Sequence, residues 1–285
     1  MARRIALVSG SNKGIGFSIV KLLVQRGFNG DVLLTSRDEG RGRQAVKELS
    51  EKFNVNVKYH QLDIDDLESI RKLGDFVQTT YGGLDVLVNN AGIAFKRAAT
   101  DPFDVQAEVT VRTNYFGTRN VCDILYPILR PGARVVHVSS MCGHLSMIPS
   151  PELRARFNAK DLTIEQLNAL MHEFVAAAKD GTHKEKGWGN SAYNASKVGV
   201  SALGFIHQRQ FDEDSREDII VNVVHPGYVD TDMSSHKGPL TPDQGADAAT
   251  YLAMLPPKDP ANPKGAYVWY TREVYPWDAE SLPRD

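Results

Sequence analysis

The sequence predicts an α/β protein: a Rossmann-type, doubly wound parallel sheet of seven strands with helices on both faces. Three observations lead to this prediction. Short apolar runs of strand length alternate with longer amphipathic stretches of helical length. A glycine-rich turn, "SGSNKGIG", follows the first apolar run. Polar and glycine residues follow the other runs, and parallel sheets bind ligands at the carboxyl ends of their strands.

The spacing of apolar and turn residues sets the order of the elements. The first five strands are each followed by a helical stretch, which implies right-handed β-α-β units. We expect strands at residues 5–9, 31–35, 57–62, 84–90, 133–140, 219–225 and 266–271. We expect helices from the glycine turn to about Arg26, over 38–53 and 65–81, then one that ends near Leu129 with Pro131 and Gly132 as stop signals, and one that carries Tyr193 to about Asp214.

The composition is that of a soluble globular protein, because 42% of the 285 residues are hydrophobic and 24% are charged. We find no linker and no repeat, so one domain over 1–285 is expected. The net charge of −2 and the lack of a basic face argue against nucleic acid as a partner. No segment approaches the ~18 apolar residues of a membrane span. Two cysteines, Cys122 and Cys142, fit a reducing compartment, so a cytoplasmic protein without a membrane partner is expected.

The glycine turn after the first strand predicts a dinucleotide site. Glycines let the backbone approach a pyrophosphate, and the next helix N-terminus favours its negative charge. The spacing differs from the commoner G-x-G-x-x-G, and many strand–helix turns need glycine for backbone reasons alone. The strand before and the helix after favour the cofactor interpretation. The candidate residues are Gly10, Asn12, Lys13, Gly14, Ile15 and Gly16.

The residues after the second strand favour NADPH over NADH. An NAD site usually has an acidic residue here, whereas Ser36 stands at that place, followed by Arg37 and Arg41. Guanidinium groups suit a 2′-phosphate, and Lys13 lies in the nearby glycine loop. The alternative is that both arginines belong to a solvated helix start. Asp38 is expected to cap this helix rather than bind ribose.

Other strand ends supply further candidates for contacts with the cofactor. After the third strand, Asp63, next to Ile64, could bond the adenine amino group or cap a helix. After the fourth strand, the asparagines of "NNAG" can satisfy loop backbone groups, and the glycine admits the cofactor. After the sixth strand, "HPGYVDT" marks the place of the nicotinamide amide. The candidates in these two loops are Asn90, Ala91, Gly92, Pro226, Gly227, Val229 and Thr231.

Tyr193 and Lys197 in "SAYNASKVGV" are the candidates for proton transfer. Four residues apart on a helix, their side chains share one face. The Lys197 ammonium would favour the phenolate and lower the tyrosine pKa from about 10. An ordinary helix face is the alternative, since such pairs are common. Ser139, at the end of the fifth strand, would face the same crevice.

Taken together, these motifs resemble the short-chain dehydrogenase/reductase family. "GSNKGIG", "NNAG", "TNYFGT", Ser139, "YNASK" and "PGYVDT" occur in the family's order over nearly the whole chain. Within the family, "LTSRDEGRG" and "RTNYFGTRNVCDILYPILRPGARVVHVSSM" look most like the monomeric NADPH-dependent carbonyl reductases. One departure is that Val224 and His225 precede the proline–glycine turn, where such reductases can carry cysteine. The chain therefore lacks that cysteine as a contact for glutathione adducts.

The resemblance implies a mechanism and a cofactor. NADPH would supply hydride, Tyr193 would donate a proton to the carbonyl oxygen, and Ser139 would hydrogen-bond that oxygen. Lys197 would lower the tyrosine pKa and hold the ribose hydroxyls. Asn114, in "RTNYFGT", would kink its helix and hold a water in a proton path; alternatively it only bonds a backbone carbonyl.

Four residues near the catalytic positions in sequence are candidates for an apolar substrate pocket: Met141, Trp188, Tyr228 and Met233. Each could instead belong to the core. The histidines, among them His144, His183 and His225, show no metal-ligand spacing, so no metal is expected.

The long segment between Ser139 and Tyr193 predicts a helical insert over about 143–188, and a tail over about 272–285 ends the chain. Apolar residues in "LTIEQLNALMHEFVAAAK" recur at helical spacing. The family resemblance implies that the long helix after the fourth strand and the tyrosine helix usually form a subunit interface. We expect the insert to cover that surface and leave a monomer. A substrate lid hinged at 179–188 is the alternative.

Three functions compete at this stage. The first is NADPH-dependent reduction of aldehydes, ketones and quinones. The second is oxidation of one alcohol, such as a steroid or prostaglandin. The third is a non-catalytic NADPH-sensing protein that binds a partner, which the full set of Ser139, Tyr193 and Lys197 disfavours.

Overall fold

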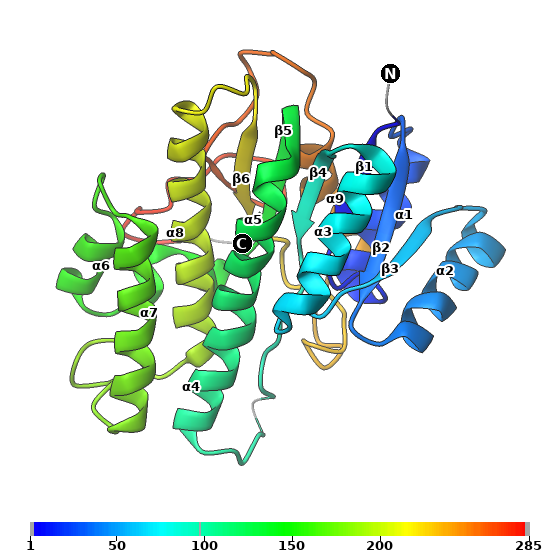
Figure 1. Ribbon diagram of the computed structural model, residues 1–285. Helices are drawn as coiled ribbons and strands as arrows, with labels where there is room; N and C mark the ends of the chain where they lie inside the picture. Colours follow the sequence, from blue (N-terminus) through cyan, green and yellow to red (C-terminus); the bar gives the residue numbers. More distant parts are fainter. Residues whose placement is uncertain (1–2, 97, 283–285) are drawn as a thin grey trace.

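The computed structural model describes residues 3–96 and 98–282, and it contains the predicted parallel sheet (Figure 1). All seven strands are parallel, in the order β3-β2-β1-β4-β5-β6-β7. The order reverses between β1 and β4, where such folds form a binding crevice. The strands are β1 (Ile5–Val8), β2 (Asp31–Ser36), β3 (Lys58–Gln61), β4 (Leu84–Asn89), β5 (Leu129–Val138), β6 (Ile220–Val224) and β7 (Tyr267–Val268).

Helices cover both faces of the sheet, as predicted. The helices α1 (Gly14–Gln25), α2 (Glu39–Phe53) and α9 (Pro242–Ala253) lie on one face. The opposite face carries α3 (Leu67–Tyr81), α5 (Thr118–Leu125) and α8 (Ala192–Asp212). Side chains of successive strand residues point to opposite faces. In β1, Ala6 and Val8 therefore join the first core, and Ile5 and Leu7 join the second.

The structure corrects two strand boundaries. The helical stretch before β5 ends as α5 at Leu125, followed by a short 3-10 turn, and β5 already begins at Leu129. Pro131 and Gly132 thus lie inside β5, at a register shift in its pairing with β4. The hydrogen-bond ladder between the two strands is interrupted there, so proline, which has no N–H, is tolerated. The last strand is only Tyr267–Val268, because the chain then turns and Val274 pairs antiparallel with Val268.

The predicted helical insert forms α6 (Pro151–Phe157) and α7 (Ile164–Lys179), at the left of Figure 1. A capping box between Thr163 and Gln166 starts α7. The apolar face of α7 is buried against α4 (Phe103–Val111) and α8. This confirms that the insert contains an amphipathic helix and packs within its own chain.

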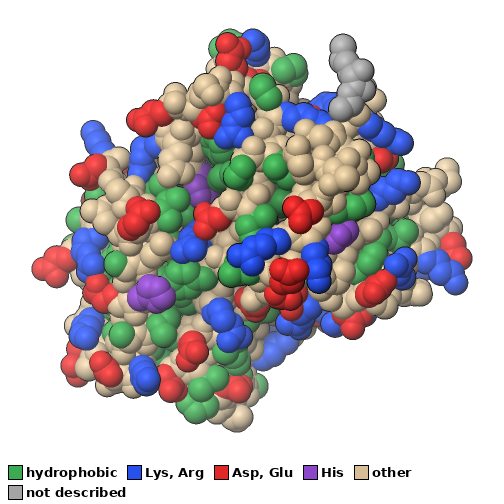
Figure 2. Space-filling model, in the orientation of Figure 1, with side chains coloured by type: hydrophobic (Ala, Val, Ile, Leu, Met, Phe, Trp, Pro, Cys, Tyr) green, Lys and Arg blue, Asp and Glu red, His purple; other side chains and the backbone are tan. Residues whose placement is uncertain are grey.

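The distribution of charge on the surface and the polarity of the helices follow what the composition predicts. On the face drawn in Figure 2, acidic and basic side chains are interspersed rather than segregated. No helix in the described part of the chain is long and apolar enough to cross a membrane.

Candidate active site

Hydrogen bonds join the glycine loop after β1 to the loop after β4 at the crevice. The Ser9 hydroxyl accepts hydrogen bonds from the backbone N–H groups of Asn90 and Ala91, both at 3.0 Å. The Asn90 amide donates to the carbonyl oxygens of Ser9 and Gly10, also at 3.0 Å. A Cβ on Gly16 would lie 2.4 Å from that amide nitrogen, so this position needs glycine. Asn90 therefore satisfies loop backbone groups, as predicted.

The N-terminus of α1 is open toward the crevice. Its N-cap residue, Lys13, makes no capping hydrogen bond with its side chain, and the first turn holds no acidic residue. The first backbone N–H groups of a helix have no partner within the helix. Asn12, Gly14 and Ile15 are partly exposed beside them. This end of the helix suits an anion such as a pyrophosphate.

The loop after β2 carries two arginines, Arg37 and Arg41, that differ in their contacts. Asp38 caps α2 by accepting a hydrogen bond from the Arg41 backbone N–H at 2.7 Å, as predicted. That bond, with weaker help from the Arg41 and Arg37 charges, lowers the Asp38 pKa. The Arg41 guanidinium lies 3.6 Å from the same carboxylate. Arg37 is exposed, and its guanidinium has no hydrogen bond or ion pair with any described residue.

After β3, Asp63 does not cap the next helix. Its carboxylate accepts from the Asp65 backbone N–H at 3.0 Å, and Asp66 is the N-cap of α3. Ile64 is buried, and its side chain packs on Gly117. Asp63 is thus the more accessible of these two candidate residues.

The loop after β6 turns through Pro226 and Gly227. The φ of Gly227 is 84°, a conformation that other residues rarely adopt. Val229 is buried and its backbone pairs with Leu240. The turn thus redirects the chain toward the glycine loop.

This loop closes over the glycine loop. The Thr231 methyl group lies 3.3 Å from the place that a Cβ would take on Gly14. The Lys13 ammonium lies 2.6 Å from the Asp232 carboxylate. Lys13, a candidate neighbour of the 2′-phosphate, is therefore paired across the crevice.

Tyr193 and Lys197 lie in the first turns of α8, whose N-cap is Ser191. The Lys197 ammonium lies 5.8 Å from the centre of the Tyr193 ring and donates to the Val138 carbonyl oxygen at 2.8 Å. Burial lowers the Lys197 pKa to about 8. The two side chains thus share a face, as the spacing predicted.

The predicted direction of the Tyr193 pKa shift is wrong for this structure. Burial raises the Tyr193 pKa above its usual value; the Cys142 thiol acts in the same direction, and a hydrogen bond with the Ser140 hydroxyl opposes both. The ammonium of Lys197 is held at the Val138 carbonyl, and loss of contact with water has the larger effect.

The two serines after β5 point in different directions. The Ser139 hydroxyl donates to the Lys197 carbonyl oxygen at 3.1 Å and lies 2.8 Å from the Ser201 hydroxyl, with 2% of the residue exposed. Ser140, which the sequence analysis did not select, interacts with Tyr193. Side chains alternate along an extended chain, so adjacent serines cannot both face Tyr193. That alternation is a signal in the sequence, but it does not say which serine faces the site.

Asn114 ties three elements together. It lies in a π-helical stretch, Arg112–Gly117, which interrupts the long helix where a kink was predicted. Its side-chain oxygen accepts from the Ile93 backbone N–H at 2.8 Å. Its amide nitrogen donates to the Ile93 carbonyl oxygen and the Ser196 hydroxyl, both at 3.0 Å. The loop after β4 is thereby fixed to α8.

The predicted pocket residues separate into two groups. Tyr228 and Met233 are 53% and 43% exposed, and Met141 is partly buried next to Ser140. Trp188 is 1% exposed and packs against Phe157 and Phe174, so it is a core residue. The sequence does not separate these cases, because an aromatic side chain serves a core or a pocket equally well.

One histidine has a role that the sequence did not reveal. His225 is buried, and its Nδ1 accepts from the Met141 backbone N–H at 2.8 Å. Burial lowers its pKa to about 4, so it is neutral and can accept this bond. His225 thereby positions the segment that follows Ser140.

A buried polar group lies behind the site. Cys122, His137 and His207 present possible ligand atoms within 4.8 Å of one another. The Tyr126 hydroxyl lies 3.3 Å from His137 Nε2 and 2.8 Å from His207 Nδ1, so one phenol bridges both imidazoles. Burial lowers the His137 pKa to about 3, so its imidazole is neutral. This group acts as an internal hydrogen-bond network.

The chain matches the family model described as short chain dehydrogenase over residues 4–152 and 179–240. It belongs to the short-chain dehydrogenase family. The glycine loop, Asn114, Ser140, Tyr193 and Lys197 all lie within the matched residues. The gap in the match falls on α6 and α7, the two helices of the insert.

Several relatives in this family are similar over nearly their full length. NADPH carbonyl reductase 1 of Rattus norvegicus is 49% identical over 277 residues, which is 96% of this chain and 99% of the relative. The Homo sapiens protein of that name is 50% identical over 266 residues, 93% of this chain and 95% of the relative. Among solved structures, salutaridine reductase from Papaver somniferum has a TM-score of 0.83 at 30% identity, and covers 93% of this chain and 99% of its own.

Proposed function

We propose that the protein reduces aldehydes, ketones and quinones with NADPH. The observation that carries the proposal is the convergence of Tyr193, Ser140 and Lys197 beside the loop after β4, where Lys197 Nζ lies 3.7 Å from the place that a Cβ would take on Gly92. The relatives named as NADPH carbonyl reductases support the same activity and cofactor. NADPH, when bound, supplies the hydride.

The residues at the strand ends fit this cofactor. The open N-terminus of α1 and the cradle at Gly10 and Gly16, which a Cβ would fill, suit a pyrophosphate. Arg37 is an exposed cation without a side-chain partner among the described residues, and it follows Ser36, which replaces the acidic residue of an NAD site. We infer that Arg37, Arg41 and Lys13 hold the 2′-phosphate. The further contacts that we infer are Asn12, Ile15, Asp63, Ile64, Asn90, Ala91, Gly92, Pro226, Gly227, Val229 and Thr231.

We assign the proton donor role to Tyr193. Its raised pKa keeps the phenol protonated at neutral pH, which suits an acid in carbonyl reduction. We assign to Ser140, in place of Ser139, the hydrogen bond to the substrate oxygen. Lys197 is mostly charged near pH 7, because its pKa is about 8, and it stabilises negative charge that develops on the phenol.

Asn114 positions the site, because it bonds the loop after β4 and the helix that carries Tyr193. We infer that it also holds a water that returns protons to the site through Lys197. Met141, Tyr228 and Met233 form the apolar rim that accepts the substrate, since methionine side chains adapt to varied shapes.

We further propose that the protein is a cytoplasmic monomer with no nucleic-acid or membrane partner. The insert helix α7 supports the monomer, because it covers α4 and α8 within the chain. The two cysteines, both free thiols, fit a reducing compartment.

A substrate panel tests the proposed activity. The purified protein is given NADPH or NADH with a quinone, an aldehyde or a ketone, and loss of the reduced nicotinamide is followed. In the reverse direction it is given NADP with a steroid or prostaglandin alcohol. Rapid reduction of several carbonyls with NADPH supports the proposal. Turnover of a single alcohol in the oxidative direction favours a specific dehydrogenase, and no turnover favours a sensor.

A further inference from the structure

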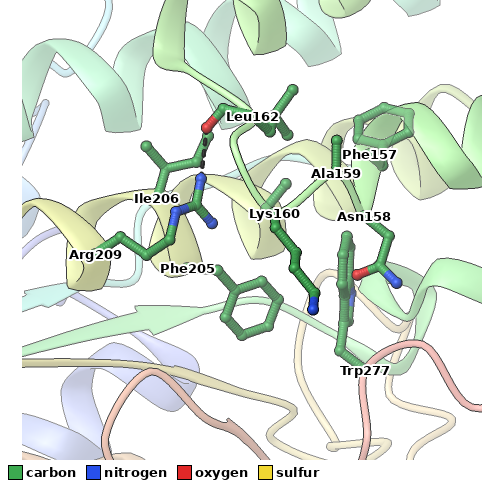
Figure 3. A pocket seen from close by; sticks show the side chains of 10 residues that line it. Phe157, Asn158, Ala159, Lys160, Leu162, Phe205, Ile206, Arg209 and Trp277 are labelled. Atoms are coloured by element: carbon green, nitrogen blue, oxygen red, sulfur yellow. Dashed lines mark hydrogen bonds between the residues drawn. The ribbon is translucent and has the colours of Figure 1, made fainter.

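A cavity of about 360 Å³ lies between the insert, α8 and the C-terminal tail (Figure 3). Its size falls in the range of small-molecule sites, about 300–1,000 Å³. Phe157 and Lys160 come from the end of α6 and the loop after it, Phe205 and Arg209 from α8, and Trp277 from the tail. The cavity therefore joins three segments that are far apart in sequence.

This cavity is separate from the catalytic site. Its contributions from α8 start at Ala202 and end at Arg209. These residues lie about 14–24 Å along the helix from Tyr193, at about 1.5 Å per residue. A compound in the cavity cannot contact the Tyr193 phenol.

The lining combines flat aromatic walls with positive charge. The rings of Phe205 and Trp277 are 5.0 Å apart between their centres, and Trp277 is 7% exposed. Among the described residues that line the cavity, the charged ones are Lys160 and Arg209. In the view of Figure 3 the Lys160 side chain extends toward Phe205 and Trp277. Two acidic residues adjoin the lining: Asp161 lies between Lys160 and Leu162 in sequence, and Asp278 accepts from the Asn158 amide at 3.0 Å.

The two cations differ in how far they are engaged. The Arg209 guanidinium donates to the Leu162 carbonyl oxygen, which fixes it at the wall. Lys160 is exposed, and its amine has no hydrogen bond or ion pair with any residue in the described parts of the chain. An unpaired ammonium beside an apolar, aromatic lining attracts an anion with an apolar body.

We propose that this cavity is a second binding site, distinct from the catalytic one, for a small aromatic carboxylate or sulfonate. The anionic group pairs with Lys160, and the ring system lies against the apolar residues of the lining. This goes beyond the proposed reductase function and does not depend on it.

Trp277 connects the cavity to the catalytic loop. Its indole N–H donates to the Gly143 carbonyl oxygen at 2.7 Å, and its own carbonyl oxygen accepts from the Leu145 backbone N–H at 3.2 Å. Gly143 ends the short turn that begins next to Ser140. An occupant that moves Trp277 shifts this turn, so we expect the second site to change turnover.

Calorimetric titration of the NADP-loaded protein with 2-naphthoate tests the site. We expect saturable binding, weakened between about two- and thirty-fold in Lys160→Glu, because the reversal removes one attraction and adds a repulsion. Lys184→Glu, an exposed lysine of the same insert outside the cavity, is the matched control and should bind as the wild-type protein does. Equal affinity in Lys160→Glu and wild-type protein overturns the proposal.

Two further measurements separate this site from the catalytic pocket. Ala202→Leu fills the cavity and should abolish naphthoate binding while NADPH binding persists; if this variant does not fold, Lys160→Glu decides.

Naphthoate should also lower kcat for carbonyl reduction at saturating substrate. Inhibition that is purely competitive with the carbonyl and unchanged in Lys160→Glu places naphthoate in the catalytic pocket and overturns the proposal. Absence of any reductase activity counts against the proposed function, and the calorimetry still reports on the second site.

Discussion

Adjacent serines at the end of β5 have different tasks. The Ser139 hydroxyl is hydrogen-bonded to the Ser201 hydroxyl and the Lys197 carbonyl oxygen, whereas Ser140 interacts with Tyr193. We expect Ser140→Ala to lower kcat by about 10²–10³-fold, the usual cost of a lost donor to a developing oxyanion. Ser139→Ala should instead lower the melting temperature, because a buried hydroxyl pair is broken. Steady-state kinetics and thermal unfolding of both variants check this; the reverse pattern restores Ser139 as the catalytic serine.

The charge of Lys197 predicts a pH dependence. Burial holds its pKa near 8, so the ammonium is present below that pH and is lost as the pH rises through it. The neutral amine cannot stabilise charge on Tyr193. We expect kcat/KM for carbonyl reduction to fall above about pH 8, a limb that reports the free enzyme. A profile that stays flat from pH 7 to 10 contradicts this role.

At the scale of elements, the loop after β2 sets the choice of cofactor. Arg37→Ser should weaken NADPH binding by about 1.5–3 kcal/mol, the usual worth of a hydrogen bond to a charged group. NADH binding should barely change, because NADH has no 2′-phosphate. Lys47→Ser, an exposed cation further along α2, is the control. Fluorescence titration with both cofactors measures the effect, and an equal loss for both would mean that Arg37 supports the fold instead.

The loops at strand ends were predictable because their chemistry is local. Gly16 must be glycine next to the Asn90 amide, and Asp38 caps the helix that follows it. The start of β5 was not predictable, because a register shift allows Pro131 inside a strand. Trp188 could not be assigned from sequence either, because its burial depends on how α6 and α7 fold back onto it.

At the scale of the whole molecule, the insert predicts the oligomeric state. Helix α7 buries Leu167, Leu170 and Phe174 against α4 and α8, and so covers apolar surface within one chain. Light scattering at micromolar concentration should give a mass near the 31.5 kDa of one chain. A stable dimer or tetramer at that concentration means that another surface mediates assembly.

The most direct test of the proposed chemistry is the rate of carbonyl reduction by Tyr193→Phe, measured together with its affinity for NADPH. This change removes the transferable proton and keeps the ring. We predict that kcat falls by about 10²–10⁴-fold while NADPH binds as it does to the wild-type protein. A variant that keeps more than about a tenth of the wild-type rate contradicts the assignment of Tyr193 as proton donor.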